Sequence, residues 1–296
     1  MNLAVQTSAL TKKYEEKTVV DNLNLQVEVG SVFVLLGTNG AGKSTVLRML
    51  AGLKRPTSGS GRCLGLDITS PSVEFREKIS YMGEEPSFYN YLHVGSLVSL
   101  CRGFYRRWDD RLVERYLEEF SIDPGVKVGE LSQGMKNQLA LILAMAPRPE
   151  LLILDEPTTG FDPVKRRLSY NALLEEFVAE GKTVLLASHQ VQDVERIADQ
   201  VGFLREGSLV FTCDMEELRA KEKEIRVVFQ KEPPRTLFQR PGVEKVEKDG
   251  AAYRVFISDH LEEIWEECAS LPHYTLEVTS LDLEEVFLRH MGGEGQ

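Results

Sequence analysis

Hydrophobic and polar positions follow three patterns along the chain. In residues 1–30 they nearly alternate, as at Leu23, Leu25 and Val27, which is typical of strands with one buried face. Three later runs are largely apolar throughout, which is typical of strands buried on both faces of a parallel sheet. These runs are Val32–Leu36, Leu151–Leu154 and Thr183–Ser188. The pattern predicts an α/β fold that opens with a β-rich segment and contains a parallel sheet.

The third pattern is helical and occupies the block between the first two of these runs. From about residue 85 to 149, apolar residues recur every three or four positions. The segments with this spacing are Val94–Tyr105, Arg111–Phe120 and Gln133–Ala146. We therefore expect a helical subdomain inserted into the α/β core.

The last part of the chain has a different organisation. Glu216–Glu224 is highly charged, and we interpret it as a solvated helix end or linker. Beyond it, Asp249-Gly250 between alternating runs indicates a hairpin. The predicted strands are Ile225–Phe229, Val243–Val246, Tyr253–Ile257 and Thr275–Val278, and the predicted helices are Leu261–Leu271 and Leu283–Met291. Two domains are expected, residues 1–218 and a small α+β domain at 219–296.

A glycine-rich segment joins the first apolar run to a helical pattern and matches G-x-x-x-x-G-K-[ST]. Glycines lack Cβ atoms, so their N–H groups can turn toward one point at the positive end of a helix, where an anion is stabilised. Lys43 is expected to reach the β- and γ-phosphates of a nucleotide, and the Ser44 hydroxyl to ligate Mg²⁺. The predicted nucleotide contacts are Gly37, Thr38, Asn39, Gly40, Ala41, Gly42, Lys43, Ser44 and Thr45.

Two carboxylates, Asp155 and Glu156, end the second apolar run, and ligands bind at the carboxyl ends of such strands. Asp155 is predicted to bind Mg²⁺ together with Ser44, and Glu156 to position or deprotonate the attacking water. The alternative is an ordinary Asp-Glu-Pro turn. Among five histidines, His189 follows the third run and is placed to contact the γ-phosphate and to orient Glu156 or the attacking water.

Composition narrows the classes of partner. The chain has 296 residues, 42% of them hydrophobic, and a net charge of −11, which argues against wrapping nucleic acid or binding an anionic membrane unaided. The basic aromatic segment Arg102–Trp108 is accordingly interpreted as a solvated helix face. The longest strongly apolar stretch, Leu139–Ala146, is too short to cross a bilayer, and no signal peptide opens the chain. Any membrane-spanning part is expected in another chain.

The order of these motifs, with Leu131-Ser132-Gln133-Gly134-Met135 before the acidic strand, resembles the ATP-binding subunit of an ABC transporter over residues 1 to about 215. The resemblance implies a P-loop NTPase (RecA-like) core with a β-rich N-terminal subdomain and the inserted helical subdomain. It also implies ATP and Mg²⁺ as ligands. Tyr14 would stack on adenine, although the residues alone fit an edge-strand aromatic equally well.

In this family two cassettes close head to tail, so the resemblance implies that Ser132 and Gly134 contact the γ-phosphate held by a second copy or a paralogue. His189 corresponds to the switch histidine. Two positions depart from the family pattern. Gln133 and Met135 replace a glycine and a glutamine of the signature, and Glu84 stands where a magnesium-ligating glutamine is usual. Glu84 is therefore a candidate metal ligand whose carboxylate adds negative charge beside the phosphates.

The segment Ser280–Phe287 is similar to the C-terminal extension of cassettes paired with ABC-2-type export permeases. It favours an ATPase that energises export of an unidentified substrate through a separate permease. The expected location is cytoplasmic, on the inner face of the cell membrane, with membrane contact only through the permease. The alternatives are a soluble ABC ATPase acting on ribosomes or DNA, and a nucleotide-dependent regulatory module with little turnover.

Overall fold

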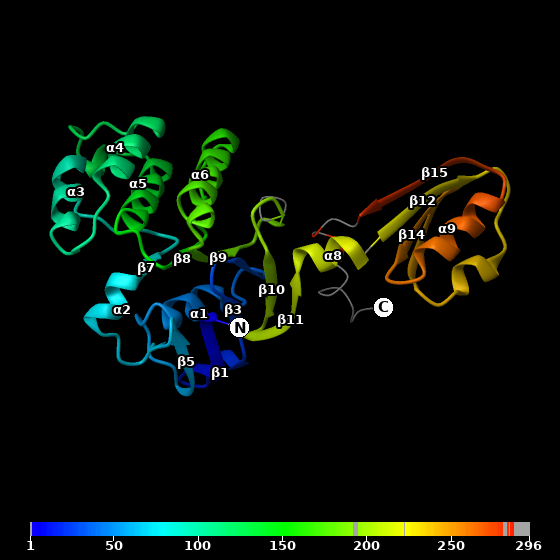
Figure 1. Ribbon diagram of the computed structural model, residues 1–296, viewed down its shortest axis with the longest axis horizontal. Coiled ribbons are helices and arrows are strands. Elements are labelled where there is room, and N and C mark those ends of the chain that lie inside the picture. The colour runs from blue at the N-terminus through cyan, green and yellow to red at the C-terminus, as the bar shows by residue number, and fades with distance from the viewer. Residues whose placement is uncertain (1, 192–194, 222, 281–282, 284, 287–296) are drawn as a thin grey trace. The chain divides into compact units, whose positions relative to one another are not determined.

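The computed structural model describes residues 2–191, 195–221, 223–280, 283, 285 and 286. The chain falls into two compact units, Met1–Thr212 and Cys213–Gln296 (Figure 1). The boundary expected from the sequence, 218/219, falls inside helix α8 (Met215–Lys221). The assignment of residues 1–218 and 219–296 to two separate domains stays a prediction.

The first unit is organised around a six-stranded sheet. In spatial order its strands are β11 (Ser208–Asp214), β10 (Gln200–Arg205), β4 (Val32–Leu36), β9 (Thr183–Ser188), β8 (Leu151–Asp155) and β7 (Ile79–Met82). The pairs from β10 to β7 are all parallel. Every residue of β4, β8 and β9 is buried, as their unbroken apolar sequences predict for strands covered on both faces. The carboxyl ends of β4, β8 and β9 therefore meet at one edge of the sheet.

A second, antiparallel sheet carries the β-rich opening. Its strands are β2 (Lys17–Leu23), β1 (Leu3–Tyr14), β5 (Ser58–Cys63) and β6 (Leu66–Asp67), with β3 (Gln26–Glu28) also paired to β1. Side chains from this sheet and from α1 (Lys43–Leu50) share one core cluster with β4, β8 and β9. That shared core fixes the loop between β4 and α1 against both sheets.

Helices α3 (Val94–Arg102), α4 (Asp110–Glu119) and α5 (Gln133–Met145) form the expected helical insertion and gather together in Figure 1. The other helical segments of this unit are α2 (Val73–Lys78), α6 (Pro163–Glu176), η1 (Val128–Glu130) and η2 (Val178–Glu180). Across the described residues, no helix combines the length and the apolar character needed to span a membrane.

The second unit contains a four-stranded antiparallel sheet of order β13 (Val243–Asp249), β14 (Ala252–Ile257), β12 (Lys223–Phe229) and β15 (His273–Ser280). Its helical segments are α8, η3 (Arg235–Gln239) and α9 (Leu261–Ser270). Strand β12 lies in the middle, and alternate residues Ile225, Val227 and Phe229 join the α9 side chains Ile264 and Cys268 in one core. Along the chain, β12, β13 and β14 are followed by helix α9 and then by β15, which pairs with β12 in the sheet. This is the α+β arrangement expected from the sequence.

One part of the charged segment differs from its interpretation as solvated. The Glu224 side chain is only 1% exposed and pairs with Arg226 at 2.8 Å and Arg254 at 2.6 Å. Burial alone raises the pKa of Glu224, but the hydrogen bonds from Arg254 and Arg226 outweigh it and hold the pKa below its ordinary value. The two arginines allow this carboxylate to enter the sheet because they compensate its lost hydration.

Candidate functional site

The loop between β4 and α1 is shaped by its glycines. Gly42, which precedes α1, has φ +106°, and a Cβ there would lie 2.7 Å from the Val19 carbonyl oxygen. A Cβ on Gly37 would lie 2.5 Å from the carbonyl oxygen of Leu204. Both contacts are with backbone, which cannot swing aside. The loop therefore needs glycine at these two positions for close packing as well as for conformation.

This loop lines a cavity of about 320 Å³ at the carboxyl edge of the parallel sheet. The lining residues are Val19, Thr38, Asn39, Gly40, Ala41, Gly42, Lys43, Ser44, Thr45, Glu84 and Glu156. The structure thus brings Glu84 and Glu156, which are 72 positions apart, to the glycine loop. A cavity at a helix N-terminus with a buried lysine is suited to an anion.

The predicted metal ligands Ser44 and Asp155 are in direct contact. The Ser44 hydroxyl donates to Asp155 Oδ1 at 3.0 Å, and the Tyr81 hydroxyl lies 3.3 Å from Asp155 Oδ2. Asp155 is fully buried, and burial raises the pKa of its carboxyl. The negative charge of Glu84 raises this pKa further. A buried acid beside a hydroxyl is a fitting place for a hard cation, which would favour the carboxylate form.

Glu156 connects the loop lysine to the histidine. Lys43 Nζ donates to the Gly37 carbonyl at 2.7 Å and lies 3.5 Å from Glu156 Oε1. His189 Nδ1 lies 2.9 Å from Glu156 Oε2. Glu156 has φ +49°, in the left-handed region, so its side chain leaves the end of β8 from a strained backbone. The structure therefore places together the predicted base, the histidine expected to orient it and the lysine expected to bind phosphate.

Four predicted nucleotide contacts do not line this cavity: Gly37, whose carbonyl accepts from Lys43, and Tyr14, Ser132 and Gly134. Tyr14 ends β1, is 38% exposed, and has the ammonium groups of Lys12 and Lys54 at 5.2 and 4.7 Å from its ring centroid. Ser132 caps α5 by accepting the Met135 N–H, and a Cβ on Gly134 would lie 2.9 Å from the Gly160 carbonyl. The roles of Tyr14, Ser132 and Gly134 stay predictions.

A neighbouring hollow begins at the same Glu84. It has a volume of about 550 Å³ and is lined by Glu84, Glu85, Pro86, Ser87, Phe88, Asn90, Gln133, Lys136, Asn137 and Thr159. Glu84 therefore lies between the cavity at the glycine loop (hereafter the nucleotide cavity, for the nucleotide predicted there) and the N-terminal part of α5. Asn137 donates to the Thr159 carbonyl at 2.8 Å, which ties α5 to the loop after β8.

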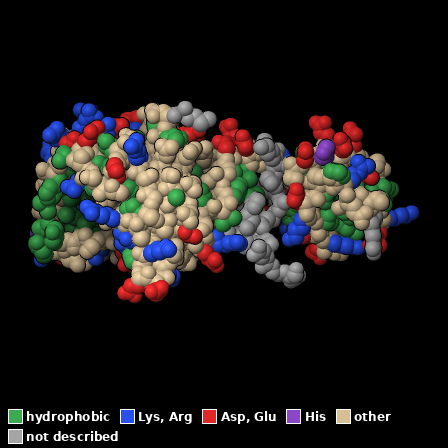
Figure 2. All heavy atoms as spheres, turned by 90° about the horizontal axis from the view of Figure 1, so that it is seen from below, with side chains coloured by type: hydrophobic (Ala, Val, Ile, Leu, Met, Phe, Trp, Pro, Cys, Tyr) green, Lys and Arg blue, Asp and Glu red, His purple; other side chains and the backbone are tan. Residues whose placement is uncertain are grey.

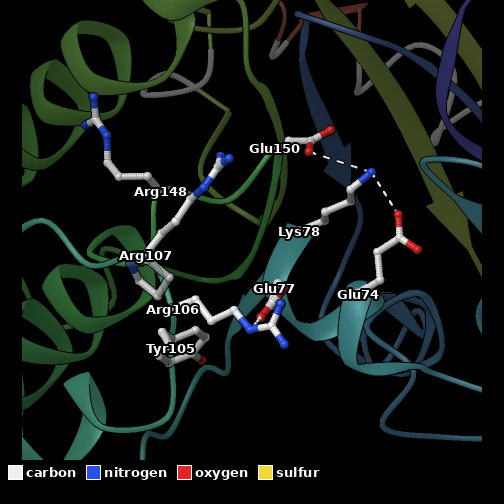
Figure 3. Close-up of a pocket in the computed structure, with 9 residues that line it drawn as sticks. Glu74, Glu77, Lys78, Tyr105, Arg106, Arg107, Arg148 and Glu150 are labelled. Atoms are coloured by element: carbon white, nitrogen blue, oxygen red, sulfur yellow. Dashed lines mark ion pairs between the residues drawn. The ribbon is translucent and has the colours of Figure 1, made fainter.

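The basic aromatic segment Arg102–Trp108 borders a third cavity, of about 310 Å³ (Figure 3). Its cations face acids: Arg106 lies 3.2 Å from Glu77, and Lys78 bridges Glu74 and Glu150 (Figure 3). Arg102 pairs with Asp110 outside the cavity. Because acids of this chain pair with two of the segment's three arginines, Arg102 and Arg106, the segment does not form a continuous unpaired basic stripe of the kind that tracks a phosphate backbone.

Sequence reasoning gave no role to Tyr81 and Arg48. Tyr81 sits in β7, next to β8, and its hydroxyl accepts from Arg48 Nε at 3.4 Å. The pairing of β7 with β8 places the ring beside Asp155, and burial raises the pKa of the Tyr81 phenol. The hydroxyl of a tyrosine in a short, largely buried strand was the available signal, since buried hydroxyls need a partner.

The parallel sheet, the glycine loop and the acids at the end of β8 define a P-loop NTPase. Residues 20–159 match the family described as "ABC transporter". The "ABC transporter ATP-binding protein YtrB" of Bacillus subtilis (strain 168) is 30% identical over 291 residues, 98% of this chain and 99% of the relative. The "Nod factor export ATP-binding protein I" of Neorhizobium galegae is 32% identical over 303 residues, 99% of this chain and 86% of the relative.

A solved "Structure of ATP binding subunit of ABC transporter" is similar with a TM-score of 0.66 and 26% identity. The similarity covers 73% of this chain and 92% of that structure. The chain belongs to the ABC transporter family, as an ATP-binding subunit with ATPase activity.

Proposed function

We propose that this ATPase hydrolyses magnesium-bound ATP to energise export of a substrate through a separate ABC-2-type permease. The observation that carries the hydrolytic part is the contact chain Lys43–Glu156–His189 at the glycine loop. The similarity to a Nod factor export ATP-binding protein over 99% of this chain supports export. The exported substrate would be selected by the permease and is not specified by this site.

Glu156 is the proposed base. Its Oε1 faces Lys43, and its Oε2 is held by His189. A γ-phosphate at the loop would attract the Lys43 ammonium and replace Glu156 as its ionic partner. Glu156 would then be free to accept a proton from a water, while His189 keeps the carboxylate oriented.

Magnesium is proposed at Ser44 and Asp155, with Glu84 as a further candidate ligand. No group of three or more His, Cys, Asp or Glu side chains in the described part of the chain could hold a metal alone. Mg²⁺ commonly takes one or two protein carboxylates and completes its shell with waters and substrate phosphates. The contact of Ser44 with Asp155 fits that mode, and the ion would neutralise charge on the phosphates.

A second cassette is proposed as a partner because Ser132 and Gly134 do not line the cavity that contains Lys43. A second copy or paralogue would present its own signature helix to the phosphate held here. ATP would then join the two subunits, and its hydrolysis would release them.

The permease is proposed to dock on the helical insertion and to hold the subunit at the cytoplasmic face of the membrane. Apolar side chains gather at the end of the first unit that carries α3 (Figure 2). Exposed large hydrophobic residues near α3 include Tyr89, Tyr91, Leu100 and Phe104. Aromatic side chains of this kind are enriched where protein surfaces meet.

Glu156→Gln tests the proposed base. The variant should bind ATP with parent affinity, lose turnover, and accumulate as an ATP-dependent dimer, because binding is kept while proton transfer is not. Lys43→Ala is the matched control and should lose nucleotide affinity in calorimetry. Turnover of Glu156→Gln at the parent rate would show that another group is the base. Steady-state ATPase with and without the permease separates a transport ATPase from a regulatory module.

A further inference from the structure

Tyr81 lies on the same face of the parallel sheet as Asp155. In the pairing of β7 with β8, Tyr81 is opposite Ile153. Asp155 is two positions beyond Ile153, and side chains two positions apart along a strand share a face. Ile153 belongs to the core cluster shared with α1, and Tyr81 packs against that cluster. The Tyr81 ring therefore lies beside the core, and its hydroxyl reaches the carboxylate at the end of β8.

Helix α1 presents two polar side chains to this face. Ser44 and Arg48 are four positions apart, so they lie on the same side of the helix. The Ser44 hydroxyl lies 3.0 Å from Asp155 Oδ1, and Arg48 Nε lies 3.4 Å from the Tyr81 hydroxyl. The Tyr81 hydroxyl lies 3.3 Å from Asp155 Oδ2. These side chains form a continuous hydrogen-bonded chain from Arg48 to Ser44.

The direction of the hydrogen bonds at Tyr81 follows from the chemistry of its neighbours. A guanidinium can only donate, and an ionised carboxylate can only accept. The Tyr81 hydroxyl lies between one of each and has a single proton. Its oxygen therefore accepts from Arg48, and its proton is donated to Asp155 Oδ2.

The backbone after β7 lies close to the same hydroxyl. A Cβ on Gly83 would lie 3.3 Å from the Tyr81 hydroxyl oxygen and 3.4 Å from its Cε1. Contacts this short are tight for a side chain, so the Gly83 main chain lies against the hydroxyl end of the ring. Glu84, which follows directly, lines the nucleotide cavity. The ring is thus held between Asp155 and the turn that carries Glu84.

The two oxygens of Asp155 have different partners. Oδ1 contacts Ser44, the other proposed magnesium ligand, whereas Oδ2 contacts Tyr81. Mg²⁺ demands near-octahedral geometry, so the orientation of a ligating carboxylate affects how well it binds. Carboxylate ligands are commonly hydrogen-bonded themselves, and loss of such a partner lowers metal affinity roughly 10–100-fold.

We propose that Tyr81 is a positioning residue for the magnesium ion. Its hydroxyl holds Oδ2 of Asp155, so that Oδ1 stays directed toward Ser44. Arg48 keeps the hydroxyl proton pointed at the carboxylate. This role rests on the proposed function, which puts Mg²⁺ at Ser44 and Asp155. Tyr81 does not line the nucleotide cavity, so it acts through Asp155.

Binding of a fluorescent, non-hydrolysable ATP analogue to the full chain tests this role. Tyr81→Phe removes the hydroxyl and keeps the ring. Its dissociation constant in saturating Mg²⁺ should rise about tenfold. We expect the lower end of the range because the 3.3 Å contact is longer than the typical O–H···O distance of about 2.8 Å. Its dissociation constant in excess EDTA should equal that of the parent, whereas loss of core packing alone would change both constants together.

Tyr116→Phe is the matched control. The Tyr116 hydroxyl also lies 3.3 Å from a carboxylate oxygen, Glu176 Oε1, but Tyr116 belongs to α4 of the helical insertion. This variant should bind the analogue as the parent does in both conditions. Asp155→Asn is the reference for loss of the proposed ligand, and it should remove the gain in affinity that Mg²⁺ gives the parent.

Arg48→Met tests the same hydrogen-bonded chain without altering Tyr81. Its effect on affinity in Mg²⁺ is measured in the parent and in the Tyr81→Phe background. The charge of Arg48 acts in both backgrounds, so the difference isolates the part that passes through the Tyr81 hydroxyl. Arg48→Met should weaken binding at least about twofold more when Tyr81 is present. Equal effects in the two backgrounds would overturn the role given to Arg48.

The parent chain separates failure of this role from failure of the proposed function. A parent that binds the analogue equally in Mg²⁺ and in EDTA would refute the proposed magnesium site, and the role of Tyr81 with it. A parent that gains affinity from Mg²⁺, alongside a Tyr81→Phe variant that gains as much, would overturn the role of Tyr81 alone. Equal weakening of Tyr81→Phe in both conditions would also overturn it.

Discussion

Two adjacent carboxylates at the end of β8 have different surroundings. Asp155 contacts two hydroxyls, those of Ser44 and Tyr81, whereas Glu156 contacts the ammonium of Lys43 and the imidazole of His189. In the proposed mechanism, the hydroxyl neighbours leave Asp155 available to a cation, and the contact with His189 orients Glu156 toward the glycine loop. The change in backbone direction at Glu156, with φ +49°, separates the two side chains. Neighbours in sequence can therefore serve metal binding and proton transfer separately.

The charge of the Glu84 side chain can be tested by a single substitution. Its carboxylate lines the nucleotide cavity, so Glu84→Gln removes a negative charge beside the phosphates. At partly solvated separations such a charge is worth about 1 kcal/mol, or roughly a fivefold change in affinity. Binding of ATP in excess EDTA should tighten by that factor, whereas binding in saturating Mg²⁺ should change less. Fluorescence titration with an ATP analogue measures both.

Glu85→Gln is the neighbouring control for Glu84→Gln. Glu85 lines the adjoining hollow but not the nucleotide cavity. Its neutralisation should leave affinity in EDTA nearly unchanged. Weaker ATP binding by Glu84→Gln in EDTA would contradict electrostatic repulsion by this side chain.

At the scale of elements, the turn from β4 into α1 depends on steric space at Gly42. Gly42→Ala forces a φ of +106° on an L-residue and brings Cβ within 2.7 Å of the Val19 carbonyl. Gly40→Ala has a similar strain at φ +83° but meets nothing within 4 Å. Strain alone costs about 1–2 kcal/mol. Gly42→Ala should therefore lose more unfolding free energy than Gly40→Ala in denaturant titrations, and equal losses would show that the close approach is unimportant.

The elements that sequence reasoning predicted well are those whose pattern has one explanation. The apolar runs Val32–Leu36 and Leu151–Leu154, each too short for a typical helix, indicate buried strands, and α5 has clear helical spacing. Strand β5, Ser58–Cys63, in contrast, is not indicated by the hydrophobic pattern of the chain. Its sequence, SGSGRC, carries no strand signal, because pairing with β1 determines its conformation.

Local sequence patterns leave other parts of the chain untested or unexplained. Residues 191–198 lie partly outside the described residues, and residues 195–197 form a turn. The final helix, Leu283–Met291, also lies mostly outside them. In the site, the glycine loop and paired acids follow from motifs, but the contact of Tyr81 with Asp155 depends on β7 lying beside β8. Sequence spacing cannot specify which strands become neighbours.

Strand β12 supplies a prediction about stability. Glu224→Gln keeps the shape of the side chain but removes the charge that Arg226 and Arg254 share, and hydrogen bonds to charged groups contribute about 1.5–3 kcal/mol. The second unit should lose stability by about that amount at pH 7. Because the folded pKa of Glu224 lies below its ordinary 4.5, the parent's advantage is complete above that pH. It should decline as pH falls further and vanish below the folded pKa.

Thermal unfolding of both proteins between pH 3.5 and pH 7.5 measures this dependence. Glu232→Gln is a suitable control, since the Glu232 side chain is 79% exposed in its pair with Lys248. An exposed pair contributes about 0–1 kcal/mol. A difference between Glu224→Gln and the parent that grows toward acid pH would contradict the linkage.

At the scale of the whole molecule, two compact units with separate cores predict two unfolding transitions. The proposed site for ATP with Mg²⁺ lies in the first unit, so ATP at a hundred times its dissociation constant should stabilise that transition by about 2.7 kcal/mol. For a unit of this size the shift is roughly 5–10 °C. Glu224→Gln should lower the other transition and leave the nucleotide-sensitive one unchanged. Calorimetry in the Glu156→Gln background avoids turnover during the scan. A single transition that responds equally to ATP and to Glu224→Gln would show that the two units unfold together.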